Sequence, residues 1–359
     1  MSRNPTDLGP SRYDLDRDGL GGLLDAEPAY RVQQVWDGLH RQLRDPPDMT
    51  DLPKALRIRL ETTLPPALDP VTESVSDDGM TTKILWRLRD GTTIETVLMH
   101  YPDRTTVCVS TQAGCAMGCG FCATGQAGFD RQLSVGEIVE QVVRAAQRAR
   151  PRRVSNVVFM GMGEPMANYD AMWAAVVRFH DALGISARHL TLSTVGIVPG
   201  IRRLAGEALP VNLAVSLHAA NDQLRDELVP INRRYPLTML AAACADYLDA
   251  KGRRLSFEWA LIDGVNDRDR DADELSEYAR GLRAHVNLIP LNPTPGYAVR
   301  GSPPRQVKAF RDRLHRLGVN ATIRRNRGTD IDAACGQLSR RASATSTVSA
   351  PRRRPQLSD

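Results

Sequence analysis

The chain has 359 residues, 42% of them hydrophobic and 25% charged, a composition typical of globular proteins that excludes a mainly disordered, collagenous or fibrous chain. It contains no run of roughly 18 uncharged apolar residues, so no transmembrane helix is predicted, and its first ten residues lack the apolar core of a secretion signal. The formal net charge is +5, with the N-terminal part acidic and the remainder basic, which permits a nucleic-acid partner without requiring one.

The N-terminal part predicts a small helical module. Residues 1–25 are rich in Asp, Gly, Arg and Pro and show no periodicity, so we expect a mobile arm. Residues 26–80 form the predicted helical domain, because apolar side chains such as Val32, Val35 and Trp36 recur there at three- and four-residue spacing. Two β-rich runs around an Arg-Asp-Gly turn then predict a β-hairpin linker over residues 81–104.

From residue 105 the pattern changes to short β-rich runs that alternate with longer helical segments. The predicted strands are Thr105–Thr111, Asn156–Met160, His189–Thr194, Val211–Leu217, Leu255–Leu261 and Val286–Leu291. Helices between them imply a parallel sheet with helices outside, an α/β fold. Six units are too few for a closed eight-stranded barrel, so residues 105–338 are predicted to form a partial (βα)6 barrel with its functional groups at the carboxyl ends of the strands. Residues 339–359, rich in Ser, Thr, Arg and Pro, are predicted to be a disordered basic tail.

Three cysteines, Cys115, Cys119 and Cys122, follow the first predicted strand with the spacing C-x3-C-x2-C. Without an export signal we expect a cytoplasmic location, where clustered cysteines indicate a metal site or redox chemistry. A structural zinc site needs four ligands, whereas three thiolates suit a [4Fe–4S] cluster with one iron open to another ligand. A zinc site with Cys108 as the fourth ligand is the alternative.

At these residues the sequence resembles the radical S-adenosylmethionine (SAM) superfamily, which has an aromatic residue, here Phe121, before the third cysteine. Over residues 26–338 it further resembles the RlmN family of dual-specificity methyltransferases, which modify carbon 2 of adenine in 23S rRNA and tRNA. The motifs that carry this resemblance are Cys108-Val-Ser-Thr-Gln-Ala-Gly-Cys115, Gly161-Met-Gly-Glu164-Pro165, Ser216-Leu217-His218, Asn292-Pro293-Thr294-Pro295-Gly296 and Asp330-Ile331-Asp332-Ala333-Ala334-Cys335-Gly336-Gln337-Leu338. Cfr-like relatives, which methylate carbon 8 of the same adenine, share most of these motifs.

The resemblance implies a radical mechanism, because carbon 2 lies between two ring nitrogens and is too electron-poor to attack the methyl group of SAM. In this family one SAM methylates a cysteine and a second SAM, reduced by the cluster, yields a 5′-deoxyadenosyl radical that activates the S-methyl group. By resemblance Cys335 carries the methyl group, and Cys108 removes the ring proton and forms a transient disulfide with Cys335. Glu95 occupies the family position of a proton acceptor, although an exposed carboxylate on a strand is an equal reading of the sequence.

The resemblance also assigns the SAM-binding residues, which follow successive strands. They are Gly163, Glu164, Ser193, Ser216, Leu217, His218 and Asn292. The carboxylate of Glu164 is suited to the ammonium group of SAM, and the hydroxyls of Ser193 and Ser216 to its carboxylate or ribose. The N-terminal domain is expected to be helix-hairpin-helix-like.

The expected targets are an adenine of the peptidyl transferase centre of 23S rRNA and the adenosine 3′ of the anticodon in tRNA. The arginine pairs at 202–203, 233–234 and 253–254 and the basic stretch 300–327 are candidates for phosphate binding. We expect a monomer without a membrane partner, and an electron donor such as a flavodoxin or ferredoxin system. A zinc-dependent RNA-binding protein without catalytic activity is the hypothesis from another class.

Overall fold

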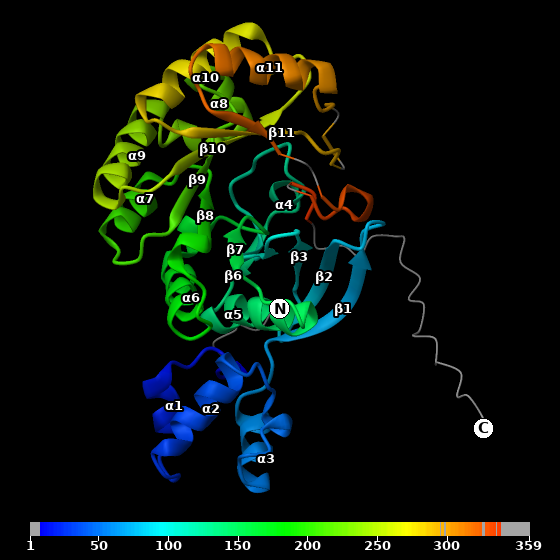
Figure 1. Cartoon of the computed structure of the whole chain (residues 1–359), viewed down its shortest axis with the longest axis vertical. Helices are drawn as coiled ribbons and strands as arrows, with labels where there is room; N and C mark the ends of the chain where they lie inside the picture. The colour runs from blue at the N-terminus through cyan, green and yellow to red at the C-terminus, as the bar shows by residue number, and fades with distance from the viewer. Residues whose placement is uncertain (1–7, 295, 298, 325–326, 335, 339–359) are drawn as a thin grey trace, which may run out of the picture.

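A ten-stranded sheet runs through the molecule and curves around its centre (Figure 1). The computed structural model describes residues 8–294, 296–297, 299–324, 327–334 and 336–338. The strand order is β1-β2-β3-β4-β7-β8-β9-β10-β11-β12, and β5 and β6 form a separate two-stranded sheet. The tail at residues 339–359 lies outside the described residues.

The strands are β1 (Leu68–Val75), β2 (Thr81–Leu88), β3 (Thr93–His100), β4 (Thr105–Cys108), β5 (Gln112–Gly114), β6 (Phe129–Gln132), β7 (Asn156–Phe159), β8 (Leu190–Thr194), β9 (Asn212–Ser216), β10 (Leu255–Leu261), β11 (His285–Pro290) and β12 (Ala321–Ile323). The α-helices are α1 (Arg17–Leu23), α2 (Tyr30–His40), α3 (Lys54–Thr63), α4 (Ala123–Gln126), α5 (Val135–Ala149), α6 (Tyr169–Asp181), α7 (Val198–Gly206), α8 (Asp222–Leu228), α9 (Leu237–Lys251), α10 (Asp269–Gly281) and α11 (Pro304–Arg316). None of these helices is long and apolar enough to cross a membrane.

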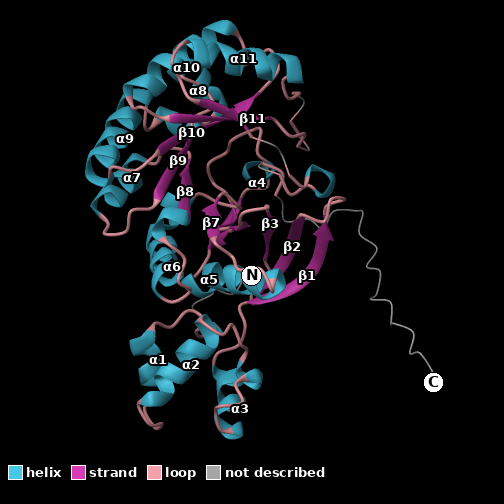
Figure 2. Ribbon diagram, in the orientation of Figure 1, coloured by secondary structure: helices cyan, strands magenta, loops and turns pink. Residues whose placement is uncertain are grey.

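Parallel pairing joins β4 and β7 through β12, and helices lie outside this curved part of the sheet (Figure 2). The predicted open α/β barrel is confirmed, and each of its six predicted strands is present. The short strand β12 adds one further parallel strand next to β11. Helix α5 begins with a capping box, in which the Ser134 hydroxyl accepts a hydrogen bond from the Glu137 amide and the Glu137 carboxylate accepts one from the Ser134 amide.

The antiparallel part of the sheet is larger than the predicted hairpin. Strands β2 and β3 form that hairpin, but β1 pairs with β2 and β3 pairs with β4, so the antiparallel strands continue directly into the barrel. Strand β1 was missed because its sequence, Leu-Asp-Pro-Val-Thr-Glu-Ser-Val, is mostly exposed and polar and includes a proline. Proline is tolerated here because β1 is an edge strand.

Residues 8–25 differ from the expected mobile arm. They contain helix α1, and Tyr13 is completely buried. The Asp14 carboxylate accepts a hydrogen bond from the Gly136 amide at 2.8 Å, at the start of α5. A Cβ atom on Gly136 would lie 2.4 Å from the Ser11 hydroxyl, so this close approach requires glycine. A segment without apolar periodicity is thus held by polar contacts with the barrel, a signal that hydrophobic pattern analysis does not detect.

Buried charges also connect the helical module to the barrel. The Arg12 guanidinium, with a side chain only 1% exposed, binds the carboxylates of Asp45 and Glu61. Asp45 in turn binds Arg144 of α5 at 2.8 Å, and Arg144 binds the fully buried Glu140 at 2.8 Å. Each of these groups has an oppositely charged partner, so no charge at the contact between the module and the barrel is left uncompensated among these residues.

Candidate active site

A cavity at the carboxyl ends of the parallel strands contains most of the residues that the sequence assigned to cofactor binding. All three cysteines of the C-x3-C-x2-C motif line it. The predicted SAM-binding residues that also line it are Gly163, Glu164, Ser193, Ser216, His218 and Asn292. Leu217 is the exception: its side chain is fully buried in the core, and its amide donates a hydrogen bond to the Glu258 carbonyl at 3.0 Å.

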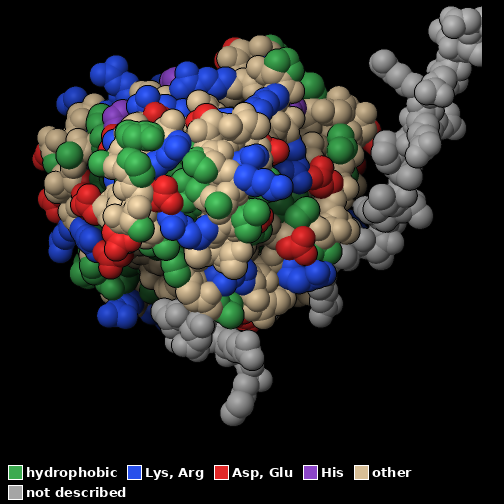
Figure 3. All heavy atoms as spheres, turned by 90° about the horizontal axis from the view of Figure 1, so that it is seen from below, with side chains coloured by type: hydrophobic (Ala, Val, Ile, Leu, Met, Phe, Trp, Pro, Cys, Tyr) green, Lys and Arg blue, Asp and Glu red, His purple; other side chains and the backbone are tan. Residues whose placement is uncertain are grey.

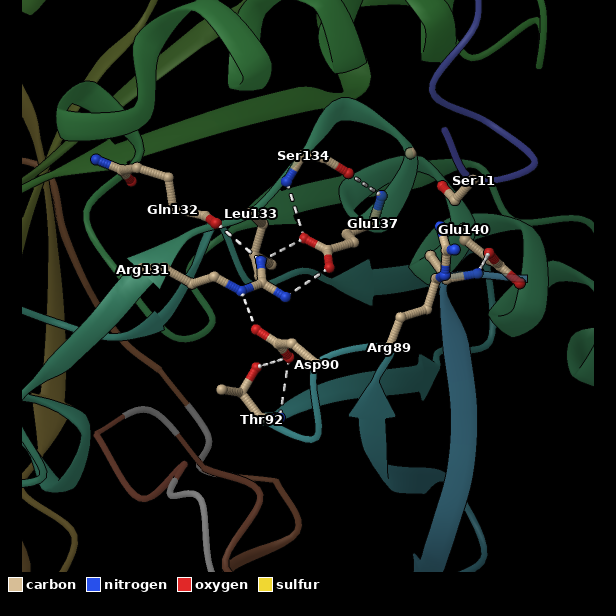
Figure 4. Close-up of polar contacts among 12 residues, drawn as sticks. Ser11, Arg89, Asp90, Thr92, Arg131, Gln132, Leu133, Ser134, Glu137 and Glu140 are labelled. Carbon is tan, nitrogen blue, oxygen red and sulfur yellow. Dashed lines mark hydrogen bonds and ion pairs between the residues drawn. The ribbon is translucent and has the colours of Figure 1, made fainter. Parts of the chain in front are cut away.

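The cysteine loop is held at both ends by the two-stranded sheet of β5 and β6. The Cys115 amide donates a hydrogen bond to the Gly128 carbonyl at 2.8 Å, which closes the base of the loop. Arg131 of β6 makes two hydrogen bonds of 2.8 Å to Glu137 of α5 and one of 2.6 Å to Asp90 in the β2–β3 turn (Figure 4). This arginine therefore anchors the loop to both the barrel and the antiparallel strands.

The three thiols are suited to a metal cluster more than to a single ion. Burial raises the pKa of Cys115 to about 12 and also raises that of Cys119, so without a cation both remain protonated and inert. Among the described residues, no three His, Cys, Asp or Glu side chains are gathered to hold one metal ion. A [4Fe–4S] cluster binds each thiolate through a different iron, so its ligands do not have to converge on one atom. The donor set and the apolar surroundings thus fit the cluster.

Glu164 is a buried carboxylate at the end of β7, and its position is fixed by the backbone. Its two oxygens accept hydrogen bonds from the amides of Met166 at 3.0 Å and Val195 at 2.9 Å. Burial raises its pKa to about 7, although these hydrogen bonds oppose the shift. A cationic ligand group would relieve the cost of this buried charge. Gly163 precedes it at φ +98°, and a Cβ atom there would lie 2.5 Å from the Gln112 side chain.

His218 presents a hydrogen-bond donor to the cavity. Its Nδ1 accepts a hydrogen bond from the Ala260 amide at 3.0 Å, so the proton of the neutral ring is on Nε2. Burial and the nearby Arg225 lower its pKa to about 3, which keeps the ring neutral. Its backbone is left-handed at φ +60°, which is unusual for a residue other than glycine and is typical of functional sites.

A smaller cavity adjoins this site and contains Cys108, at the end of β4. Cys108 is buried, and Ala333 and Ala334 of the C-terminal segment line the same small cavity. Gly336 and Leu338 line the larger cavity with the three cysteines. The Gly336 carbonyl accepts a hydrogen bond from the Ala123 amide at 2.8 Å, next to Cys122. Cys335 lies outside the described residues, but its neighbours on either side border the two cavities.

Glu95 is buried on β3. The alternative that the sequence allowed, an exposed carboxylate on a strand, is therefore wrong. Its Oε1 lies 3.1 Å from the ammonium group of Lys83, and the two side chains are 2% and 6% exposed. The same ammonium donates a hydrogen bond to the carbonyl of Asp332 at 3.2 Å. Lys83 therefore connects Glu95 to the segment that contains Cys335.

Known proteins resemble this chain along most of its length. A profile of the Radical SAM superfamily matches residues 109–275. A probable dual-specificity RNA methyltransferase RlmN of Parafrankia sp. (strain EAN1pec) is 55% identical over 353 residues, 92% of each chain. The corresponding protein of Chloroflexus aurantiacus is 50% identical over 349 residues, 92% of this chain and 93% of that one. The chain belongs to the RlmN family.

A solved structure agrees with this assignment. The crystal structure of a radical SAM methyltransferase from Sphaerobacter thermophilus, 52% identical, matches 92% of this chain and 100% of that one with a TM-score of 0.91. As an RlmN-family protein the chain is a radical SAM methyltransferase, and this superfamily implies SAM and an iron–sulfur cluster as cofactors.

Sequence reasoning missed two charged residues near the RlmN-family site, Lys83 and Glu258, and placed Arg324 only within the basic stretch 300–327. Glu258 and Arg324 line the larger cavity, and their charged groups lie 3.7 Å apart. A signal was present for Glu258, because it is the single charged residue of strand β10, whereas β2 contains Arg87 as well as Lys83. Such a charge is costly to bury unless it has a partner, so it marks a site worth inspecting.

Proposed function

We propose that this RlmN-family enzyme methylates carbon 2 of adenine in 23S rRNA and in tRNA. The targets are the adenine of the peptidyl transferase centre and the adenosine 3′ of the anticodon, with two SAM consumed for each methyl group transferred. The observation that carries the proposal is the path of the C-terminal segment. Ala334 borders the cavity of Cys108, and Gly336 borders the cavity of the three cysteines.

The larger cavity is proposed to hold both cofactors. Cys115, Cys119 and Cys122 would bind a [4Fe–4S] cluster, which with SAM supplies the radical chemistry that an electron-poor ring carbon requires. Glu164, held in place by two backbone amides, would accept the ammonium group of SAM. The Nε2–H of His218 would donate a hydrogen bond to SAM. Ser193, Ser216 and Asn292 would add further polar contacts at the same edge of the sheet.

Cys335 is proposed to carry the methyl carbon as a thioether, and Cys108 to remove the ring proton and then form a disulfide with Cys335. Burial in a small, mainly apolar cavity would shield the Cys108 thiol from solvent between turnovers. Glu95 is proposed to assist as a proton acceptor, with Lys83 holding its carboxylate toward the C-terminal segment.

The experiment is methylation of 23S rRNA fragments and tRNA by the anaerobically reconstituted enzyme, followed by nucleoside digestion and mass spectrometry against standards. We expect 2-methyladenosine from the wild type and none from Cys335→Ala or Cys108→Ala. Cys244→Ala is the matched control and should retain activity, because Cys244 is fully buried on α9, away from both cavities. An 8-methyladenosine product would reject the proposed specificity, and methylation by Cys335→Ala would reject the thioether.

A further inference from the structure

A second large cavity opens at the amino-terminal ends of the parallel strands, at the opposite end of the barrel from the cysteine loop. Its volume is about 1080 Å³, at the upper end of the roughly 300–1,000 Å³ typical of small-molecule pockets. Residues at or near the start of β4, β7, β8, β9, β10, β11 and β12 line it. Neither the mechanism proposed above nor the motifs of the sequence account for this cavity.

The lining of this cavity is strongly basic. It contains six arginines and a single acidic residue, Glu258. The arginines are Arg104, Arg188, Arg253, Arg254, Arg324 and Arg327. The guanidinium groups of Arg104 and Arg327 lie 4.0 and 4.3 Å from the centroid of the Tyr101 ring, which also lines the cavity. Such a cluster of positive charge in a concave site attracts polyanions.

Two of these arginines are available for an external ligand. The side chains of Arg188 and Arg254 are exposed, and neither forms an ion pair or side-chain hydrogen bond with any described residue. By contrast, several arginines that the sequence suggested for RNA binding have intramolecular partners: Arg202 pairs with Asp246, Arg203 with Asp170, and Arg313 with Asp269 and Asp273. The lower face of the molecule also shows basic and acidic side chains interspersed rather than one continuous basic patch (Figure 3).

The inner surface of the cavity carries groups suited to hydrogen bonding with a base. Asn156, Asn212, Asn287 and Asn320 line it. Within the described residues, Nδ1 of His285 is buried without a hydrogen-bond partner, whereas Oε2 of Glu258 lies 3.7 Å from the guanidinium group of Arg324. Buried polar atoms are nearly always satisfied, so unsatisfied atoms in a cavity indicate a ligand that satisfies them.

The basic cavity adjoins both parts of the candidate active site. Met160, Glu258 and Arg324 line it and also the cavity of the three cysteines. Met99, Tyr101 and Arg327 line it and also the small cavity of Cys108. A group bound among the arginines therefore lies next to the walls of the cavity that Cys108 and Ala334 line.

We propose that this cavity is where single-stranded RNA enters the enzyme. The arginines, Arg188 and Arg254 among them, bind backbone phosphates, and one unstacked nucleotide extends inward toward Met160 and Arg324, whose side chains contact each other at 3.6 Å. RNA thus approaches from the amino-terminal ends of the strands, and the methyl donor occupies their carboxyl ends. The inference rests on the proposed function, because it takes RNA as the substrate. It adds to that function the surface of the enzyme that binds the RNA.

The test compares two double variants that remove the same charge. Arg188→Gln/Arg254→Gln alters the cavity, and Arg270→Gln/Arg280→Gln alters two exposed positions on α10, outside the cavity and outside the basic stretch 300–327. Binding of a fluorescent RNA hairpin with unpaired adenosines in its loop is measured by anisotropy at several salt concentrations. The slope of log K against log salt falls by about 0.7–0.9 for each phosphate that the protein no longer neutralises, so we expect a decrease of about 1.5 for the cavity variant and no change for the control.

A second readout separates this inference from the proposed function. The cavity variant should raise the KM for RNA with kcat changed less than about twofold, and it should cleave SAM without RNA as the wild type does. An unchanged salt slope in the cavity variant, or an equal change in both variants, would overturn the inference. Failure of the proposed function would instead appear as wild-type enzyme that binds RNA with the expected slope but forms no 2-methyladenosine.

Discussion

Replacement of Lys83 by methionine tests the buried pair that connects Glu95 to the C-terminal segment. Methionine preserves much of the apolar length of the side chain but removes the ammonium group that lies 3.1 Å from the Glu95 carboxylate. Removal of one partner from a buried ion pair typically costs about 3–5 kcal/mol, because the remaining charge stays desolvated. The two side chains are 6% and 2% exposed, so solvent screens this pair very little. We therefore expect Lys83→Met to lose about 3–5 kcal/mol of unfolding free energy.

The assay is a double-mutant cycle by urea denaturation with Lys83→Met, Glu95→Gln and the double variant. The double variant should be more stable than Lys83→Met alone, because the neutral glutamine leaves no buried charge without a partner. Lys54→Met, at an exposed position at the start of α3, is the control and should change stability by less than about 0.5 kcal/mol. Two results would contradict the prediction: a loss of unfolding free energy in Lys83→Met as small as in Lys54→Met, or a double variant no more stable than Lys83→Met. Either would mean that the ion pair does not contribute the free energy expected from its burial.

Two further predictions concern the turn that contains Glu164. Because burial raises the pKa of Glu164 from 4.5 to about 7, the folded protein binds an additional proton between these values, so this group lowers stability as pH rises from about 4.5 to 7. The ionised carboxylate is suited to accept an ammonium group, so the affinity of the wild type for SAM, measured by equilibrium dialysis, should rise with pH up to about 7 and then level off. In Glu164→Gln the affinity for SAM should not depend on pH in this range. If Glu164→Gln showed the same pH dependence as the wild type, Glu164 would not be the group that titrates. Gly163→Ala would place a methyl group 2.5 Å from the Gln112 side chain and 2.7 Å from its backbone nitrogen, so thermal unfolding should reveal a loss of about 1–3 kcal/mol or more, and wild-type stability would exclude the steric argument.

The barrel was predictable from the sequence because its signals are local. Its six predicted strands are short apolar runs that alternate with helical segments, and Ser134 with Glu137 identifies the start of α5. Strand β1 and the ordered residues 8–25 were not predictable in this way. Their places depend on long-range contacts, such as those of Asp14 with Gly136 and Arg12 with Asp45.

The candidate site was predictable where residues act through a motif. The cysteine motif and the Gly161–Pro165 turn predicted which residues line the larger cavity. Both motifs follow strands whose carboxyl ends meet at one edge of the sheet. Leu217 shows the limit of this reasoning, since it directly follows β9 between two cavity-lining residues, Ser216 and His218, yet its own side chain is buried in the core. Glu258 pairs with Arg324, and Lys83 donates a hydrogen bond to the Asp332 carbonyl. Both partners are distant in sequence, and no motif reveals these contacts.

The ionic contacts of Arg12, Asp45, Arg144 and Glu140 have a consequence for the recognition of a large substrate. They join the helical module to α5, and the side chains of Arg12 and Glu140 are almost completely buried. These contacts fix the position of the module relative to the barrel. A folded RNA that contacts both would have to fit that arrangement, so discrimination among RNAs would depend on their three-dimensional shape as well as on the bases that they expose.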